Sequence, residues 1–248
     1  MLCAIWEMRV KIAKIYEILD QIAPFCEQES WDNSGLLLGS MQDEFEKLYL
    51  SLDLDSTLVG EMLPNSLVIT HHPLIFGGLK KIDNLYPSNL IRELIKKEIK
   101  LICMHTNFDK FVLNDYVATQ ILQVDTVDRD DFLIYFEPNL SFDEFGKWLK
   151  KRLNLKQIHA VKAGDFIKRV ALCTGSGGDL IDSILADCFI TGDIRYHLAL
   201  KAYENSISLF DITHFGSERY FALALAKHLQ KNQIEVIIRN SINPFSYI

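Results

Sequence analysis

Ser66-Leu-Val-Ile-Thr-His-His-Pro73 indicates the fold most directly, because an apolar run of strand length ends there in two histidines. Histidine or carboxylate side chains also follow three further apolar runs: Leu101–Met104, Asp187–Thr191 and Ile207–Ile212. In an open α/β sheet, ligands bind at the carboxyl ends of the strands. Histidines and carboxylates gathered at that edge are typical of sites for zinc, iron or manganese. The sequence therefore predicts an α/β fold with a metal site at strand ends.

Helical patterns alternate with these strand-like runs. Val10–Phe25 places apolar residues at helical spacing, and Ser141-Phe-Asp-Glu144 has the form of a capping box that opens a helix. We expect two similar α/β lobes, residues 1–125 and 126–248, with the final elements able to pack back on the first lobe.

An internal repeat favours this division. Val68-Ile-Thr70 ends a strand in the first half, and Phe189-Ile-Thr191 ends one in the second half. Nearly the same interval separates Asp55 from Thr70 and Gly175 from Thr191. Chance resemblance between two βαβ units is the alternative that spacing alone leaves open.

The composition is that of an ordinary globular chain and limits the expected partners. The 248 residues are 49% hydrophobic and 24% charged, with a formal net charge of −7. Proteins that bind nucleic acid concentrate Lys and Arg, so nucleic acid is not an expected partner. The basic runs Lys96-Lys97 and Lys147–Arg152 have the pattern of solvated helix faces. No stretch approaches the roughly 20 apolar residues of a membrane span, so no membrane association is expected.

The amino terminus and the cysteines point to a cytoplasmic protein. The first ten residues, MLCAIWEMRV, lack a basic n-region and contain Glu7, so a signal peptide is not expected, and Met8 is a possible second start. Five cysteines without a CxxC pair predict neither a disulfide framework nor a thiolate zinc site. Those in apolar strand-like runs are expected in the core: Cys103, Cys173 and Cys188.

Each candidate ligand has an ordinary structural explanation when taken alone. Consecutive strand side chains point to opposite faces, so His71 and His72 serve one site only if the chain turns there, or each holds a separate metal. Asp109 lies in a Thr-Asn-containing loop and could simply be a turn former. His214 and Glu218 have i, i+4 spacing, which places them on one helix face but is also common in surface pairs.

Taken together, the segments resemble the GTP cyclohydrolase I type 2 homologs, also called the Nif-three-like proteins, along nearly the whole chain. The matching segments, in order, are Trp31-Asp-Asn-Ser-Gly35, Ile69-Thr-His-His-Pro73, His105-Thr-Asn-Phe-Asp109, Gly175-Ser-Gly-Gly178, Thr191-Gly-Asp193, Tyr196-His197, and His214 with Glu218. Many relatives carry a long insertion between the lobes. Residues 124–170 are too short for it, so the chain is similar to the compact form.

The resemblance implies a dinuclear centre of divalent ions, zinc, iron or manganese, in the cleft between the lobes. Carried over by motif, His71 and Asp109 would hold one ion and His72 and His214 the other, with Glu218 bridging both. A bridging carboxylate can hold two ions roughly 3.5–4 Å apart that share a water or hydroxide. Glu218 is therefore also a candidate catalytic residue.

Two other histidines of the matching segments have open roles. His105 is not a ligand in the pattern that the resemblance implies. It could be an additional ligand, a group behind the ligands, or a proton carrier and hence catalytic. His197 is interpreted as a satisfied histidine facing the site or as a proton-transfer group, whereas His159 and His228 receive no role.

The glycine-rich segment and two departures from the family pattern bear on the same site. Gly175, Ser176 and Gly177 could bind a phosphate of the substrate at a helix N-terminus, or form a plain tight turn. Thr213 stands where the family usually has Gly, and could tighten the loop around the following histidine. Asp193 stands where the family usually has Glu, and the shorter side chain leaves its role open.

The leading functional hypothesis is metal-dependent hydrolysis of a nucleotide or related small molecule. Metal ions would lower the pKa of a bound water and polarise the scissile group. The family name implies opening of the purine ring of GTP, although the sequence shows neither a base-reading constellation nor a basic triphosphate clamp. The alternative is a non-enzymatic protein that binds or delivers metal, or an interaction partner with structural metals. An open metal position would favour the enzyme, and closed coordination the alternative.

The resemblance also implies a ring-shaped homohexamer whose metal clefts face a central cavity, which would favour small substrates. Two apolar segments, Leu36–Leu38 and Pro244–Ile248, could be buried between subunits or could belong to the monomer core.

Overall fold

The computed structural model describes residues 10–246 and has a mixed α/β fold. The chain forms two compact units, and within the described residues unit 1 comprises 10–108 with 221–246 and unit 2 comprises 109–220. The sequence placed the lobe boundary after residue 125 and allowed the final elements to pack back on the first lobe. The units divide earlier because the helical stretch before that boundary packs against a strand of unit 2. The possible second start at Met8 lies outside the described residues.

Unit 1 contains a five-stranded sheet in the order β15-β4-β5-β6-β2. Its first four strands are parallel, and β2 is antiparallel to β6. The strands are β2 (Gly35–Leu38), β4 (Lys47–Ser51), β5 (Ser66–Thr70), β6 (Lys100–Cys103) and β15 (Ile237–Ile238). A separate short antiparallel pair is formed by β1 (Val10–Lys11) and β3 (Glu44–Phe45).

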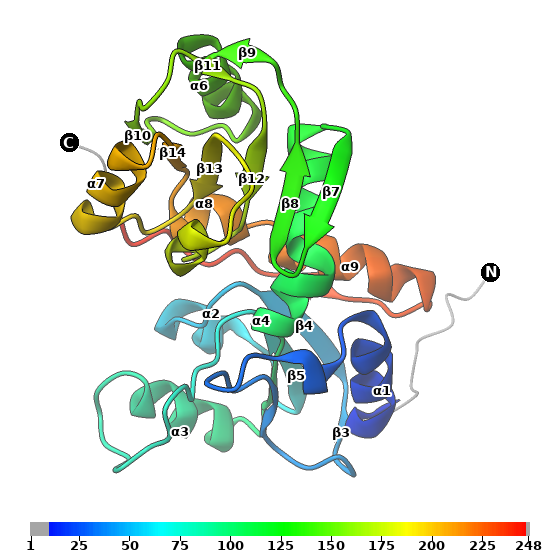
Figure 1. The fold of residues 1–248 in the computed structure, drawn as a ribbon. Helices are drawn as coiled ribbons and strands as arrows, with labels where there is room; N and C mark the ends of the chain where they lie inside the picture. Colours follow the sequence, from blue (N-terminus) through cyan, green and yellow to red (C-terminus); the bar gives the residue numbers. More distant parts are fainter. Residues whose placement is uncertain (1–9, 247–248) are drawn as a thin grey trace. The chain divides into compact units, whose positions relative to one another are not determined.

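Helices lie on both sides of the unit 1 strands (Figure 1), which accounts for the burial of every residue of β5. On one face, Tyr49, Val68 and Leu101 pack against apolar side chains of α2 and α3. The helix predicted from residue 10 begins at Ile12 and buries three apolar residues at the expected spacing. The helical elements are α1 (Ile12–Ile22), the 3₁₀ turn η1 (Phe25–Glu27), α2 (Ser56–Glu61), α3 (Ser88–Lys96), α4 (Thr106–Phe108) and α9 (Phe221–Lys231).

Unit 2 contains a six-stranded sheet in the order β10-β14-β13-β12-β8-β7. The central strands β12, β13 and β14 are parallel, and the outer strands are antiparallel to their neighbours. The strands are β7 (Thr126–Asp130), β8 (Leu133–Phe136), β10 (His159–Val161), β12 (Val170–Leu172), β13 (Cys188–Thr191) and β14 (Ser208–Asp211). A short antiparallel pair is formed by β9 (Leu140–Ser141) and β11 (Phe166–Ile167).

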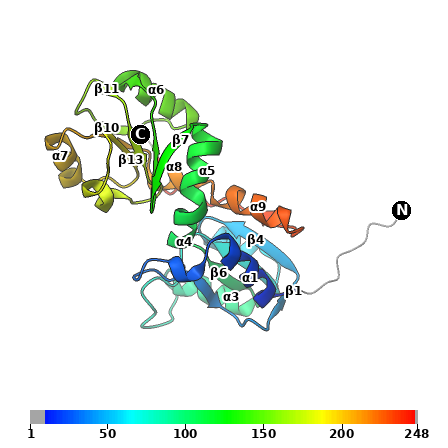
Figure 2. The ribbon, with the colours of Figure 1, turned by 45° about the vertical axis from the view of Figure 1, so that its right-hand side comes forward.

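The helices of unit 2 also lie on both sides of its strands, with α5 and α7 on opposite sides (Figure 2). The predicted capping box is present at α6: the Ser141 hydroxyl accepts from the Glu144 N–H, and the Glu144 carboxylate accepts from the Ser141 N–H. The helical elements are the π-helical turns η2 (Asp109–Leu113) and η3 (Val117–Leu122), α5 (Asn114–Tyr116), α6 (Phe142–Arg152), the 3₁₀ turn η4 (Gly178–Asp182), α7 (Tyr196–Glu204) and α8 (His214–Glu218).

In each unit, three neighbouring parallel strands deliver the candidate site residues from their carboxyl ends. In unit 1 these strands are β4, β5 and β6, followed respectively by Asp53, His71 with His72, and His105. In unit 2 they are β12, β13 and β14, followed by Gly175, Asp193 and His214. In both sheets these candidate residues therefore lie at the edge where open α/β sheets bind ligands. Among the described helices, none has the length and apolar character to span a membrane.

Candidate functional site

The chain turns directly after β5, and this turn brings two adjacent histidines together. The backbone N–H groups of His71 and His72 both donate to the Leu52 carbonyl, at 3.2 and 3.1 Å. Pro73 follows and has no N–H with which to continue a strand ladder. The two imidazole centroids lie 5.0 Å apart, so both rings serve the same end of the sheet.

Both imidazoles are held through Nδ1. His71 Nδ1 lies 2.8 Å from the Met104 carbonyl oxygen, and His72 Nδ1 lies 2.6 Å from Asp53 Oδ1. A carbonyl or carboxylate oxygen can only accept, so each Nδ1 carries a proton, and in the neutral ring each Nε2 carries the lone pair. Metal-binding histidines in proteins have this arrangement, with the second ring nitrogen bonded to an oxygen. The pair is therefore in the tautomer that binds metal through Nε2.

His105 follows the same pattern with a buried carboxylate. Its Nδ1 lies 2.7 Å from Asp32 Oδ1, and the Asp32 side chain is fully buried. Asp32 also accepts from the backbone N–H and the hydroxyl of Thr106. Burial raises the pKa of Asp32, but the bonds from His105 and Thr106 outweigh burial and hold that pKa well below its ordinary value. Asp32 therefore stays ionised and fixes the His105 ring.

The three histidines of unit 1 form one cluster. His71, His72 and His105 each offer a ring nitrogen, and these nitrogens lie within 4.8 Å of one another. Three imidazoles with ring orientations fixed by oxygen acceptors fit a divalent ion such as zinc. His105 thus lies beside His71 and His72. The family pattern includes these two among the ligands but does not include His105.

Unit 2 supplies two buried carboxylates. Asp109 and Glu218 are 7% and 2% exposed, and they offer oxygens within 4.8 Å of each other. Asp109 Oδ1 accepts from the Thr174 hydroxyl at 3.2 Å, and its backbone carbonyl accepts from the Asn114 amide at 3.0 Å. Two carboxylates buried together repel each other and favour protonation or a cation. This pair is the part of unit 2 that best fits a divalent ion.

The sequence placed Asp109 in a loop, but the structure places it in a helical turn. It begins the π-helical turn η2 directly after α4. The expectation failed because the polar side chains that suggested a turn make tertiary hydrogen bonds instead: Thr106 bonds Asp32, and the Asn107 amide donates to the Ala23 carbonyl at 2.7 Å. π-Helical turns occur frequently at functional sites.

His214 and Glu218 share one face of α8, as their spacing predicted. Their side chains are joined by a 2.9 Å contact between Nε2 and Oε2. His214 Nδ1 lies 2.7 Å from Asp193 Oδ2, which gives Asp193 a defined position despite its shorter side chain. Burial lowers the pKa of His214, but the bonds and charges of Glu218 and Asp193 outweigh burial and raise that pKa to about 9. His214 is therefore protonated at neutral pH in the metal-free protein.

The glycine-rich loop after β12 is closely fitted around Glu218. A Cβ at Gly175, whose φ is +66°, would lie 2.2 Å from Glu218 Oε1. The Gly175 N–H donates to the Ser217 hydroxyl at 2.9 Å, and the Gly177 N–H donates to the Thr191 hydroxyl at 2.8 Å. Both N–H groups are thus used within unit 2, while Ser176 is exposed. Phosphate binding by Gly175, Ser176 and Gly177 remains a prediction.

Thr213 adopts a backbone conformation that a β-branched residue rarely adopts. Its φ is 64° and its ψ is 151°, a region that is essentially restricted to Gly. Its hydroxyl accepts from the Gly216 N–H at 3.0 Å and caps α8, the helix that carries His214 and Glu218. The side chain that replaces the usual Gly therefore caps the helix but strains the backbone.

We expect Thr213→Gly and Thr213→Ala to differ in stability. Glycine relieves strain of about 1–3 kcal/mol and loses only a few tenths of a kcal/mol of capping. Alanine keeps the strain and loses about 1 kcal/mol of capping. Urea unfolding should therefore find the Gly variant more stable than the Ala variant by at least about 1 kcal/mol. Equal stabilities would show that the backbone is not strained at this position.

The remaining histidines lie apart from these clusters or have ordinary environments. His197 is exposed on α7, with its ring 5.4 Å from that of Tyr196. His159 lies exposed in strand β10. His228 lies on α9, where burial and the Lys231 charge lower its pKa.

Sequence reasoning did not identify the carboxylates that hold the imidazoles. Asp32, Asp53 and Asp193 each contact one histidine through Nδ1. A signal was present for two of them, because Asp53 and Asp193 follow the ends of β4 and β13. Carboxylates at the same sheet edge as candidate ligand histidines are the expected partners of the second ring nitrogen.

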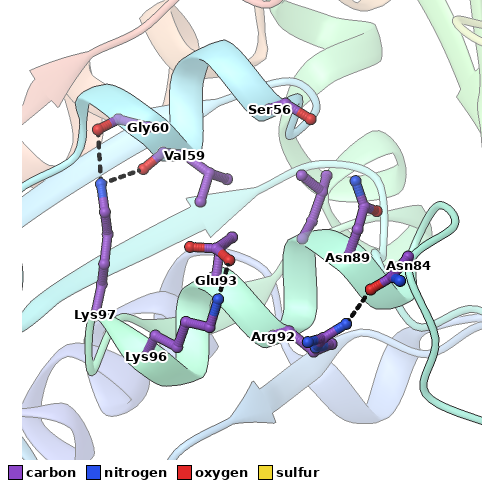
Figure 3. Close-up of a pocket in the computed structure, with 10 residues that line it drawn as sticks. Ser56, Val59, Gly60, Asn84, Asn89, Arg92, Glu93, Lys96 and Lys97 are labelled. Carbon is purple, nitrogen blue, oxygen red and sulfur yellow. Dashed lines mark hydrogen bonds and ion pairs between the residues drawn. The ribbon is translucent and has the colours of Figure 1, made fainter.

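A separate hollow of about 450 Å³ lies between α2 and α3 of unit 1 (Figure 3), and none of the residues lining it is a candidate ligand. Its charged groups are engaged locally. Lys97 Nζ donates to the carbonyls of Val59 and Gly60 near the end of α2, and Lys96 pairs with Glu93 at 2.5 Å. Such bonds to the last carbonyls stabilise a helix end. Lys97 is thus half-buried and also bonds the carbonyls at the end of α2.

A comparison with known protein families identifies the family of the chain. The model of the family described as Duf34/NIF3 (NGG1p interacting factor 3) matches residues 10–244. The chain belongs to this family. The resemblance found in the sequence motifs is thereby confirmed.

Individual Duf34/NIF3 relatives agree. The chain is 52% identical to a GTP cyclohydrolase 1 type 2 homolog of Campylobacter jejuni, over 96% of this chain and all of that protein. It is 40% identical to a GTP cyclohydrolase 1 type 2 of Helicobacter pylori, over 96% of this chain and 99% of that protein. The crystal structure of a hypothetical protein of Staphylococcus aureus has the same fold, with a TM-score of 0.83, 26% identity, and coverage of 97% and 100% of the two chains.

Proposed function

We propose that this protein is a metal-dependent hydrolase acting on a nucleotide or a related small molecule. The observation that carries the proposal is the state of the three candidate ligand histidines, His71, His72 and His214. Each has Nδ1 bonded to an oxygen acceptor, which leaves Nε2 as the metal-binding atom; at His214 an ion would displace the proton that Nε2 shares with Glu218. The buried carboxylates Asp109 and Glu218 supply anionic ligands of the kind that divalent ions need. The names of the Campylobacter and Helicobacter relatives favour GTP or a similar nucleotide.

The proposed centre contains two divalent ions of zinc, iron or manganese. Following the family resemblance, His71 and Asp109 would hold one ion, His72 and His214 the other, and Glu218 would bridge them. Bound ions would supply Lewis-acid activation of water and of the scissile group.

His105 is the proposed proton carrier. Asp32 stays ionised and accepts from Nδ1–H, so in the neutral ring it is Nε2 of His105 that carries the lone pair and would take a proton from the attacking water. Asp32 would also stabilise the imidazolium that forms. The protonated ring can then return the proton to the leaving group.

A coupled experiment tests the hydrolase. Nucleotides and phosphoesters are screened with the purified protein before chelation, after chelation, and after Zn²⁺, Fe²⁺ or Mn²⁺ is restored. Activity should vanish on chelation and return with metal. His105→Gln should lower kcat by roughly 10²–10⁴-fold without changing the metal content, as expected for loss of a general base. His159→Gln, at an exposed histidine, is the matched control. A rate that is indifferent to chelation would exclude the metal mechanism.

A non-enzymatic metal-binding or metal-delivery protein is the second candidate. The observation that favours it is the third imidazole in unit 1, because His105 lies within the same 4.8 Å cluster as His71 and His72. If His105 is a ligand, it could close a position that a substrate or water would need. In that case His105→Gln would release metal, whereas loss of the proton carrier would not.

Metal binding should release protons at neutral pH. The raised pKa of His214, about 9, means that the metal-free protein holds a proton that the ion must displace. Apparent metal affinity should therefore rise with pH up to about 9. The stability that this imidazolium contributes is complete below its unfolded pKa of about 6.5 and lost as pH rises through about 9. The metal-free protein should thus become less stable between pH 7 and 9 while its metal affinity increases.

Calorimetry in two buffers of different ionisation enthalpy measures this proton release directly. We expect close to one proton per chain from His214 at pH 7. Asp193→Asn removes one of the two carboxylates that raise the pKa, and should reduce the release. A release that is the same at pH 7 and pH 10 would contradict the assignment.

We also propose the ring-shaped homohexamer that the family resemblance implies. The sequence support for it is reduced, because Leu37 and Leu38 pack against the core of unit 1. Phe245 is exposed, and the last two residues of the segment Pro244–Ile248 lie outside the described residues. Light scattering on dilute protein tests the assembly, and a stable mass near 28.5 kDa, that of one chain, would refute it.

A further inference from the structure

Two large aromatic side chains are exposed beside His105. Trp31 is 57% exposed and Phe76 is 54% exposed. Their ring centroids lie 6.1 and 6.4 Å from that of His105 and 6.0 Å from each other. All three pairs have edge-to-face geometry, with interplanar angles between 60° and 79°.

The segment Trp31-Asp-Asn-Ser34 positions this aromatic pair. Asp32 holds His105, and the Ser34 hydroxyl accepts from the His105 backbone N–H at 3.0 Å. The Asn33 amide donates to the carbonyl of Ile75 at 2.6 Å, which ties the loop carrying Phe76 to the loop carrying Trp31. The side chains of Asp32, Asn33 and Ser34 therefore all make internal bonds, while Trp31, which precedes them, is mostly exposed.

Packing does not account for leaving these rings exposed. A large aromatic side chain stabilises a fold in proportion to the area that it buries, and each of these two residues is more than half exposed. Yet Asn33 fixes both loops, so the rings are held in place without being covered. Exposed, pre-positioned aromatic faces beside a catalytic group are a feature of ligand-binding surfaces.

We propose that Trp31 and Phe76 bind the planar heteroaromatic ring of the substrate, a purine-type base, beside His105. Aromatic faces recognise bases by stacking, without needing a hydrogen-bonding code. A centroid distance of 6.0 Å at a 60° tilt leaves no parallel slot between Trp31 and Phe76. The base therefore stacks on the exposed face of one ring and meets the edge of the other. The inference rests on the proposed function, since the base is placed next to the proposed proton carrier.

The two exposed aromatic faces suit an uncharged heteroaromatic ring better than a phosphate. The main competing occupant is a second copy of the chain, because the loop after Phe76 carries further exposed apolar residues: Leu79, Ile82, Leu85 and Tyr86.

The test compares two probes on the metal-loaded protein. Guanosine 5′-monophosphate contains the base, and ribose 5-phosphate does not. Stacking contributes about 1–3 kcal/mol per base, so Trp31→Ala should weaken binding of the nucleotide by roughly 5- to 150-fold. Trp31→Phe should restore most of the affinity. Affinity for ribose 5-phosphate, metal content and particle mass should not change. Phe166→Ala, at an aromatic residue of unit 2 that is 56% exposed, is the control.

Failure of this inference can be told apart from failure of the proposed function. Nucleotide binding that depends on Trp31, in a protein that hydrolyses nothing, supports the base site and rejects the hydrolase. Metal-dependent hydrolysis with unchanged nucleotide affinity in Trp31→Ala rejects the base site alone. Equal losses for both probes, no nucleotide binding by the wild type at millimolar concentration, or a change of particle mass in Trp31→Ala would each overturn the base site.

Discussion

Replacing Glu218 with Gln is expected to reduce the bound metal from two ions per chain to fewer than one. Glutamine has nearly the same volume and can still bond His214, so the buried position stays filled. It has no charge, however, and a neutral amide is a poor bridge between two divalent ions. Elemental analysis after gel filtration measures the change. Glu204→Gln, at an exposed glutamate of α7 in the same unit, is the control and should keep its metal.

Asp109→Asn separates a bridging carboxylate from a terminal one. It should release one ion and leave the second, because only Glu218 is proposed to contact both. The same change should raise the melting temperature of the metal-free protein, since it removes one of two carboxylates that are buried within 4.8 Å of each other. Unchanged stoichiometry in Glu218→Gln, or equal losses in the two variants, would exclude Glu218 as the bridge.

Local rules predicted where several candidate ligands lie in the fold, whereas the ligand set itself came from the family resemblance. An apolar run of strand length predicted β5 and the histidines after it, and i, i+4 spacing predicted that His214 and Glu218 share a helix face. The turn at His71 and His72 was left open, because a strand pattern does not show whether the chain bends at its end. The structure supplies the reason for that bend, which is the shared Leu52 carbonyl.

The groups that hold the ligands could not be predicted in the same way. Asp32 is 73 residues from His105, Asp53 is 19 residues from His72, and Asp193 is 21 residues from His214. Such pairs form only when strands that are distant in sequence become neighbours in a sheet. The hairpin of β7 and β8 was missed for another reason. All five residues of β7 are exposed, so the strand lacks the apolar alternation that predicts one.

Gly175→Ala is expected to have the other large effect, through Glu218. The added Cβ would lie 2.2 Å from Glu218 Oε1, far inside van der Waals contact. The loop cannot easily withdraw, because the Gly175 N–H bonds the Ser217 hydroxyl and the Gly175 carbonyl accepts from the Gly192 N–H at 2.8 Å. Alanine would also occupy a φ of +66°, which costs about 1–3 kcal/mol.

The variant should therefore lose most of its metal and about 2 kcal/mol or more of its free energy of unfolding. Gly164→Ala is the control, because its Cβ would meet only the Phe166 carbonyl at 3.9 Å, and its effect should stay within about 0.5 kcal/mol. Adding Glu218→Asp to Gly175→Ala shortens the carboxylate by one methylene and should recover part of the stability without restoring the metal. That recovery would show that the glycine is required by the carboxylate it faces. If the double variant is no more stable than Gly175→Ala, backbone strain at residue 175 accounts for the loss and the contact with Glu218 does not.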